Sequence, residues 1–318
     1  MNGGNAVFKY IMQRVGYMFI TLFLIVSITF LLLQFMPGSP FKDEKLTDEQ
    51  KKILNDKYGL SDPLPIKYLR YMGKVAKLDF GVSFKYSNKP VTDMIAERVK
   101  HSAIVGAEAL FLGTFIGIIL GIAAALHRNG FWDHFATLIA VLGVSIPSFV
   151  FAALIQQWLG VELKVLPIIY ETAPDKLFMS TIMPTIALSV GVIAGIARFM
   201  RTEMIEVLGS DYILLAQAKG LSKKTVIWKH AIRNALIPII TIMGPMTLGL
   251  LTGATVVERI FAVPGLGQMI VTAINTNDYF VILAEATIYS ALFVVVILIV
   301  DILYGVIDPR IRVVGGGE

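Results

Sequence analysis

The residue types that carry most enzyme chemistry are absent from this sequence or scattered along it. The 318 residues contain no cysteine, which excludes thiolate nucleophiles, disulfides and cysteine-ligated metal sites. The histidines stand too far apart to form the i, i+3 or i, i+4 pairs of a helical metal site; they are His101, His127, His134 and His230. The pattern G-x-x-x-x-G-K-[ST] does not occur, so the chain has no ATP-binding loop of that type. We therefore expect no metal ion and no cofactor in this chain.

Serine chemistry is not supported either. The sequence has no G-x-S-x-G motif, and the serines of Ser145-Ile-Pro-Ser148 have no base placed beside them by sequence. The sequence offers neither the nucleophile with its base nor the metal site that an intramembrane enzyme would need. The chain is therefore not expected to be an enzyme.

Acidic residues inside apolar runs are the remaining candidates for chemistry, because a charge at membrane depth is costly and marks a pathway by default. Glu108 is the one strong case. It either lines a translocation path or hydrogen-bonds another subunit, or it lies hydrated near the outer headgroups. Glu285 and Asp301 flank a charge-free run, and we interpret them as markers of its two ends. A proton-coupled transporter is expected to need more than one deeply placed acid or histidine.

The composition identifies the class of protein. Hydrophobic residues make up 56% of the chain and charged residues only 16%, and the mean hydropathy is +0.72. Soluble domains have about 25% charged residues, and disordered chains combine low hydrophobicity with high charge, so both classes are excluded. The net charge of +5 is explained by lysines and arginines that orient membrane spans, and we expect no nucleic-acid partner.

Six apolar runs are each long enough to cross about 30 Å of hydrocarbon as a helix, which takes about 20 residues. The first covers about residues 12–36 and is followed by Pro37-Gly-Ser-Pro40 rather than by the small-residue cleavage site of a signal peptide. Five runs follow a polar segment that ends near residue 100: about 101–126, 135–160, 177–200, 237–257 and 281–307. The sequence therefore predicts an all-α polytopic membrane protein with six transmembrane helices.

The glycines and prolines inside these runs indicate helices that pack closely or bend. Gly113, Gly117 and Gly121 recur at four-residue spacing in the second run, which places them on one helix face and lets a neighbouring backbone approach. Prolines interrupt three later runs, at Pro147, Pro184 and Pro245. Proline is tolerated in membrane helices and often bends them.

Lysine and arginine orient the spans, because short cytoplasmic loops carry an excess of both. With the N-terminus inside, twelve fall in the short inside segments: Lys9, Arg14, Arg128, Arg198, Arg201, Lys219, Lys223, Lys224, Lys229, Arg233, Arg310 and Arg312. Three fall in the short outside loops: Lys164, Lys176 and Arg259. The thirteen in the 37–101 segment are set aside because long loops cross regardless of charge. We predict a multi-pass plasma-membrane protein with both termini in the cytoplasm.

The connection between the fourth and fifth spans, residues 201–237, is the most informative segment. Ser210 or Asp211 can cap a short helix, Gly220 can end that helix in the left-handed conformation, and Ser222 can cap the next one. We expect two short helices joined by a glycine turn.

The first of these helices is amphipathic and can act in two ways. Ile213, Leu214, Ala216 and Ala218 are available to dock, while Gln217 and Lys219 face elsewhere. The helix either inserts into a groove of a partner protein or lies on the lipid surface.

This segment resembles the cytoplasmic loop, called the EAA loop, of ABC importer permeases, in the form found in peptide permeases of the DppB/OppB type. The resemblance extends over almost the whole chain, with eight short motifs in order around the six spans. They are Pro37-Gly-Ser-Pro40, Tyr58-Gly-Leu60 with Pro63-Leu64, Asp79-Phe-Gly-Val-Ser-Phe84, Ile146-Pro-Ser-Phe149, Val263-Pro-Gly-Leu-Gly267, Asn277-Asp-Tyr279, Asp301-Ile-Leu-Tyr304 and Asp308-Pro-Arg-Ile311.

The loop departs from the general superfamily pattern. Leu214-Leu-Ala216 stands where that pattern has Glu-Ala-Ala, and His230-Ala-Ile-Arg233 stands where it has Ile-x-Leu-Pro. Both stretches are similar to the peptide-permease variant, Ala-x-Ala-Lys-Gly followed by His-Ala-x-Arg-Asn-Ala.

The resemblance implies a type I ABC importer permease fold and one half of a permease pair. The implied partners are a homologous second permease, one or two cytoplasmic ATPases that hold ATP and magnesium, and an extracellular peptide-binding protein. Residues 1–100 would form the first span with an extracellular segment, 101–308 the five-span permease domain, and 309–318 a cytoplasmic tail.

The resemblance also implies site residues. The docking role carries over to Ala216, Ala218, Lys219 and Gly220, with Asp211 at the start of the same helix. ATP-driven closure of the ATPases would move this loop and rock the two permeases about a central path. Candidate residues of that path are Glu108, Ser145 and Pro147.

The substrate and one alternative function remain open. Oligopeptides are the first expectation and dipeptides the second, because the ending 301–311 and the stretch 80–84 are most similar to oligopeptide permeases. The alternative is an ion-coupled secondary transporter or channel without an ATPase, which six spans alone would allow.

Overall fold

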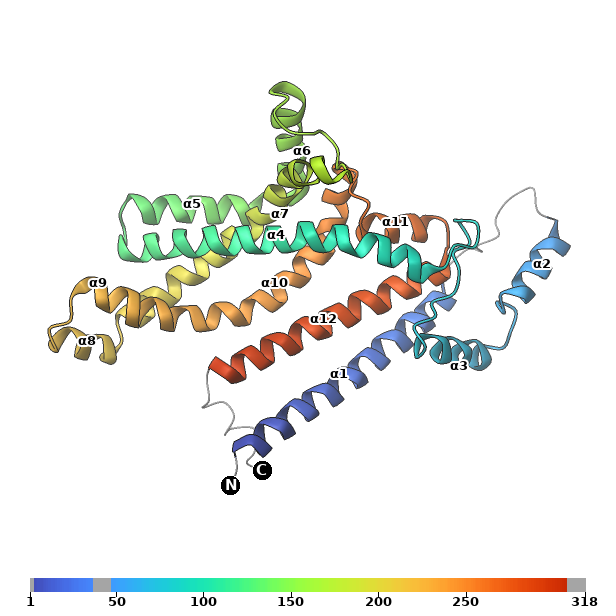
Figure 1. Ribbon diagram of the computed structural model, residues 1–318, viewed down its shortest axis with the longest axis horizontal. Helices are drawn as coiled ribbons and strands as arrows, with labels where there is room; N and C mark the ends of the chain where they lie inside the picture. Colours follow the sequence, from blue (N-terminus) through green and yellow to red (C-terminus); the bar gives the residue numbers. More distant parts are fainter. Residues whose placement is uncertain (1–2, 37–46, 308–318) are drawn as a thin grey trace.

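The computed structural model describes residues 3–36 and 47–307, which are helical with no β-strand among them. Five long helices dominate (Figure 1): α1 (Gly3–Gln34), α4 (Val91–Leu126), α7 (Pro174–Leu208), α10 (Ile232–Ile260) and α12 (Tyr279–Ile307). The shorter helices are α2 (Asp48–Lys57), α3 (Leu64–Val75), α5 (Phe131–Ser145), α6 (Ser148–Ile155), α8 (Asp211–Ala218), α9 (Lys223–Thr225) and α11 (Leu266–Asn275).

The number of membrane spans agrees with the sequence prediction. Among the described residues, five helices are long and apolar enough to cross a membrane, and α5 with α6 supplies a sixth if this bent pair is one span. Each predicted apolar run lies in one of these helices or in the bent pair, and polar turns extend several helices beyond the run; α4, for example, starts at Val91 rather than near residue 101. The prediction of an all-α, polytopic fold is confirmed.

The third span is not the single helix that the apolar run 135–160 predicts. α5 and the helical segment Ser148–Glu162 meet at an angle of 100°. The break lies at Ile146, whose backbone is extended (φ −92°, ψ 122°), and at Pro147. Proline has no amide hydrogen and disfavours the helical conformation of the residue before it, so Ile146 leaves the helix and α6 begins in a new direction.

The centre of the molecule is the packing of α4 against α7, which overlap obliquely in the view of Figure 1. Gly113, Gly117 and Gly121 form the contact face of α4 and are buried. A β-carbon at Gly117 would lie 2.7 Å from the β-carbon of Ile196 and 3.1 Å from the carbonyl oxygen of Ile193. The four-residue glycine spacing therefore marks a close helix contact, as the sequence indicates.

α3 joins α1 to α12. The Phe30 ring on α1 stacks on Tyr71 of α3 with ring centroids 5.4 Å apart. The Tyr71 hydroxyl lies 3.1 Å from the Thr287 hydroxyl on α12. Burial raises the pKa of Tyr71 to about 12, so its hydroxyl keeps its proton at neutral pH. The long polar segment after span one therefore contributes a helix that is fixed to two spans.

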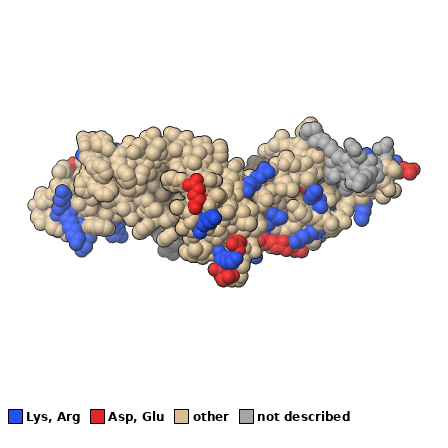
Figure 2. Space-filling view, turned by 90° about the horizontal axis from the view of Figure 1, so that it is seen from above, with Lys and Arg blue, Asp and Glu red and all other residues tan. Residues whose placement is uncertain are grey.

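The molecule has two distinct ends. We call the end that carries α8 and α9 the α8 end, and the end that carries α3 and α11 the α3 end (Figure 1). Lysines and arginines gather at the α8 end, and charges of both signs cover the half that carries the α3 end (Figure 2). Uncharged surface separates them on the face shown, as expected for a membrane protein with polar ends.

Candidate functional site

The α8 helix presents one face to its own chain and the other to solvent. Ile213 is 0% exposed and Ala216 is 7% exposed, and both belong to the hydrophobic cluster that includes Met204 and Val226. Leu214 and Leu215 on the outer face are each 57% exposed. α8 is therefore held firmly while it offers large apolar side chains at the α8 end.

A glycine turn follows α8, as predicted. Gly220 has a φ of +77°, which glycine adopts without the steric cost that a β-carbon brings. A β-carbon there would meet no described atom within 4 Å, so the backbone conformation rather than crowding favours glycine. Leu221 then donates an amide hydrogen bond to the Ala216 carbonyl (3.3 Å). The turn reverses the chain into α9.

The capping predictions are partly right. Ser222 caps α9, with its hydroxyl accepting the Thr225 amide (3.3 Å). Ser210 is the N-cap of α8, but its hydroxyl donates to the Val207 carbonyl (2.6 Å) instead of capping. The second short helix is not separate, because α9 continues through a π-helical segment, Val226–Ala231, into α10. Short turns therefore connect α8 to α7 on one side and to the continuous helix formed by α9 and α10 on the other.

The predicted docking residues divide between the two faces of α8. Asp211 lies in the first turn and is exposed, and Ala218, Lys219 and Gly220 are exposed at the other end. Ala216 does not face outward: it packs against its own chain and positions α8, and its carried-over docking role stays a prediction. The exposure of Leu215 was not predicted, because eight residues do not show which side of the helix faces the core.

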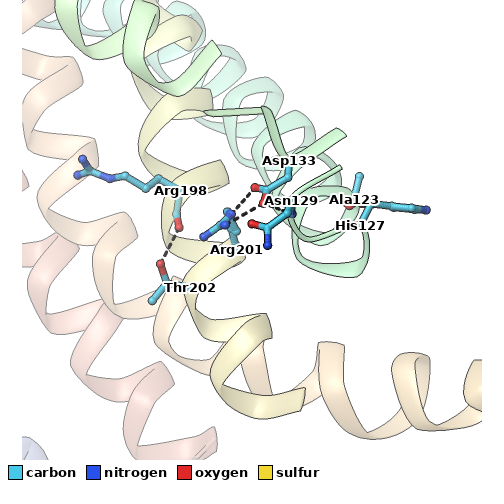
Figure 3. Close-up of polar contacts among 7 residues, drawn as sticks. All are labelled: Ala123, His127, Asn129, Asp133, Arg198, Arg201 and Thr202. Atoms are coloured by element: carbon cyan, nitrogen blue, oxygen red, sulfur yellow. Dashed lines mark hydrogen bonds and ion pairs between the residues drawn. The ribbon is translucent and has the colours of Figure 1, made fainter. Parts of the chain in front are cut away.

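An ion pair near the α8 end ties α5 to α7 (Figure 3). The Arg201 guanidinium donates from Nε to Asp133 Oδ1 and from Nη2 to Asp133 Oδ2, the latter at 2.9 Å. The backbone amide of Asn129 donates a hydrogen bond to the same carboxylate at 2.8 Å. The Asp133 side chain is 4% exposed and that of Arg201 31% exposed. This two-bond geometry fixes the turn between α4 and α5 to the last part of α7.

Replacing Asp133 with alanine is expected to destabilise the purified protein by roughly 2 kcal/mol, because it removes the hydrogen bonds between Asp133 and Arg201, and a hydrogen bond to a charged group contributes about 1.5–3 kcal/mol. Thermal unfolding in detergent measures the effect. The matched control is Asp175→Ala, since Asp175 is an exposed carboxylate in the first turn of α7. Equal unfolding temperatures for the two variants would show that the pair does not hold α5 to α7.

Two of the three candidate path residues line cavities beside α5. Ser145 lines a cavity of about 330 Å³ between α5 and α7, together with Thr137 and Arg198. Pro147 lines a second cavity of about 330 Å³, between the α5–α6 break, α7 and α10. The break at Ile146 and Pro147 therefore lies between two hollows.

Glu108 is not brought to these cavities. It is half-buried on α4, and its carboxylate accepts a hydrogen bond from the Thr185 hydroxyl on α7 (2.8 Å). Within the described residues, Glu108 thus joins two helices of its own chain.

Two acids, Glu258 on α10 and Glu285 on α12, are buried although the sequence does not predict their burial. Glu258 is 2% exposed and accepts hydrogen bonds from the Ser102 hydroxyl (2.6 Å) and from the backbone amide of Gln268 (3.2 Å). Ser102 in turn accepts the Leu266 amide (2.9 Å). The pair therefore caps the N-terminus of α11, where a carboxylate is favoured by the helix dipole.

Glu285 is the second, and its interpretation as a marker of the end of an apolar run stays a prediction, although its side chain is not exposed there. It is 0% exposed, and neither carboxylate oxygen has a hydrogen-bond partner among the described residues. Glu285 lies near the start of an apolar run in the sequence. An exposed acid is expected at the same position, so the sequence does not distinguish an exposed from a buried Glu285. Asp301 lies within α12, but its side chain falls outside the described residues.

The described histidines do not contribute to a group of side chains of the kind that holds a metal ion. His101 is buried, with its Nδ1 2.9 Å from the Tyr170 hydroxyl. In the part of the chain that the structure describes, no group of three His, Cys, Asp or Glu side chains could hold a metal ion.

Several of the sequence motifs meet at the α3 end. Asp278 accepts a hydrogen bond from the Ser83 hydroxyl, which joins the motif 79–84 to the motif 277–279. Phe84 contacts Tyr58, with ring centroids 4.9 Å apart, and Phe280, at 5.1 Å. The motifs 37–40 and 308–311 lie outside the described residues. Stretches that are distant in sequence therefore build one structural unit.

Family models match both parts of the chain. The model described as a binding-protein-dependent transport system inner membrane component matches residues 117–313. The model of the N-terminal part of such membrane components matches residues 7–103.

Curated relatives are similar over nearly the full length. The dipeptide transport system permease protein DppB of Lactococcus lactis is 48% identical over 96% of this chain and 99% of the relative. DppB of Bacillus subtilis is 42% identical over 96% and 98%. The oligopeptide transport system permease protein OppB of Escherichia coli is 40% identical over 96% and 99%.

Solved structures share the fold. A chain of the MetNI methionine ABC transporter in an inward-facing conformation has a TM-score of 0.57 and 16% identity, covering 68% of this chain and 96% of that chain. An amino acid ABC transporter has a TM-score of 0.51 and 17% identity, covering 69% and 94%. The part of the chain that these matches cover therefore has the fold of ABC transporter permease chains.

Proposed function

Because the chain belongs to the family of binding-protein-dependent transport system inner membrane components, we propose that it is the membrane-spanning subunit of an ATP-driven importer of short peptides. The observation that carries this proposal is the similarity to peptide permeases along 96% of the chain, together with the outward-facing leucines of α8. The chain supplies half of the translocation path and the contact that couples it to ATP.

The remaining components of the importer are separate chains. Since this sequence has no phosphate-binding loop, ATP and magnesium bind in one or two cytoplasmic ATPases. A homologous second permease completes the path, and an extracellular peptide-binding protein delivers the substrate.

The α8 end faces the cytoplasm in this proposal. Twelve lysines and arginines in short segments on that side against three on the other support this orientation. α1 begins and α12 ends on the side of the molecule that carries α8 (Figure 1), which supports a cytoplasmic location for both of these helix ends.

Coupling follows from how α8 is attached. An ATPase groove that receives Leu214 and Leu215 moves α8 as a rigid body, because Ile213 and Ala216 are buried in the chain's own core. α8 lies directly between α7 and the segment that continues into α10. The Asp133–Arg201 pair carries the motion of α7 to α5, and the hollows beside α5 then open to one side of the membrane or the other.

The substrates are short peptides. The relatives include both a dipeptide permease, at 48% identity, and an oligopeptide permease, at 40%. The walls of the cavities beside Ser145 and Pro147 are mostly small or apolar side chains. Such walls suit a permissive path, with selection made by the binding protein.

Uptake of a labelled peptide into proteoliposomes tests this function. The complex that purifies with the tagged chain is reconstituted with ATP inside the vesicles and binding protein with peptide outside. We expect uptake that requires ATP and the binding protein and that a protonophore does not abolish. Uptake without ATP, driven by a proton or sodium gradient, would support the ion-coupled alternative instead.

A further inference from the structure

A cavity of about 200 Å³ at the α3 end has no role in the transport cycle described above. Its walls come from the last turns of α1, from α3, from the first turn of α12, and from the stretches 58–60 and 79–80. Phe30, Tyr71 and Leu283 make part of its apolar wall. The cavity thus lies where α3 joins α1 to α12.

Three cations of α3 line this cavity: Lys67, Arg70 and Lys74. Their spacing of three and four residues places them on one face of the helix. One carboxylate among the described residues, that of Asp79, lines the cavity with them, so the lining carries an excess of positive charge.

The cations differ in how they are neutralised. Arg70 pairs with Asp62 (2.6 Å), and Lys74 lies 3.8 Å from Asp79. Lys67 donates only to neutral acceptors in the described residues, the Gln34 side chain on α1 (3.0 Å) and the Leu60 carbonyl (3.4 Å). Lys67 is therefore positioned to receive an anion.

The surroundings place the cavity at the level of lipid headgroups. α1 is an apolar span up to Gln34, so its last turn ends where hydrocarbon gives way to the polar layer. α3 also exposes Ile66 (49%) and Leu69 (69%), as a helix does that lies in the membrane interface.

We propose that this cavity binds the phosphate headgroup of an anionic phospholipid, with Lys67 and Lys74 as its cationic contacts and the apolar wall along α1 and α12 facing the acyl chains. The volume of 200 Å³ is below the roughly 300–1,000 Å³ of sites for drug-sized ligands, which favours a headgroup over a peptide. The bound lipid fastens α1 to α12 through α3. This site goes beyond the proposed transport function, and its test needs neither ATP nor peptide.

Native mass spectrometry of the purified full-length chain in mild detergent tests the site. The chain is titrated with palmitoyl-oleoyl phosphatidylglycerol or with the phosphatidylcholine of the same acyl chains. We expect one phosphatidylglycerol to bind with clear preference over phosphatidylcholine. Each of Lys67→Gln and Lys74→Gln is expected to weaken it about fivefold, the effect of one cation near a charged lipid surface. Lys67→Arg, which keeps the charge, is expected to bind as the unmodified chain does.

Lys77→Gln is the matched control, since Lys77 is an exposed lysine just beyond α3 that does not line the cavity. We expect it to leave lipid binding unchanged. Equal lipid binding by the unmodified chain and the Lys67→Gln, Lys74→Gln double variant would overturn the proposal, as would an equal loss in Lys77→Gln. sn-Glycerol 3-phosphate is added in a separate titration. If it binds as tightly as the lipid, the site takes a free phosphate and the lipid assignment is wrong.

Discussion

Replacing Leu214 and Leu215 together by aspartate is expected to reduce ATP-driven peptide uptake to background while the chain still inserts and folds. Both side chains are 57% exposed, so the change removes little packing within the chain. In a partner groove, however, each leucine becomes an acidic side chain buried without a partner. Central interface residues contribute about 2 kcal/mol or more, which is roughly 30-fold in affinity for each position.

Uptake and co-purification of the ATPase are measured on the same membranes. The control is the Leu214→Met, Leu215→Met variant, which keeps both side chains apolar at nearly the same volume and is expected to retain uptake. Full uptake by the aspartate variant at normal expression would remove the coupling role of α8.

Replacing Gly117 with valine is expected to prevent stable assembly of α4 with α7. A β-carbon at Gly117 lies 2.7 Å from the Ile196 β-carbon and 3.1 Å from the Ile193 carbonyl oxygen. The Ile193 oxygen belongs to the helix backbone, and the Ile196 β-carbon is the branch point of a β-branched side chain. Neither atom can therefore move away unless the two helices separate. Overpacking of a dense interior costs about 1–3 kcal/mol, and the adjacent glycine contacts at Gly113 and Gly121 are lost with the same separation.

The amount of monodisperse protein after detergent extraction measures this effect. Gly106→Val is the matched control, because Gly106 lies on the same helix and no described atom stands within 4 Å of an added β-carbon there. We expect Gly106→Val to extract like the unmodified chain and Gly117→Val to aggregate or be degraded. Equal yields of the two variants would contradict the close contact between α4 and α7.

Features set by local sequence were predictable. The glycines of α4 indicate close packing by their spacing alone, and Gly220 indicates a left-handed turn, because both depend on the absence of a β-carbon. Pro147 indicates a bend, since the restriction on Ile146 is local. The angle of 100° is not predictable, because it depends on what α6 packs against.

Features set by contacts between distant residues were not predictable. The hydropathy pattern predicts that Glu285 marks the end of an apolar run. In the structure its side chain is completely buried. The hydrogen bond between Ser83 and Asp278 joins residues far apart in sequence. In α8, Leu214 and Ala216 are both apolar, and only the position of the core shows that Ala216 faces inward.

In the proposed importer, this chain works as a permease joined to separate ATPases. Purification of the tagged chain from membranes of its own cell in a mild detergent, followed by identification of the accompanying polypeptides by mass spectrometry, tests it most directly. We predict a second multi-span permease and at least one ATPase with a phosphate-binding loop. A stable homo-oligomer with no ATPase at any detergent concentration would contradict the claim.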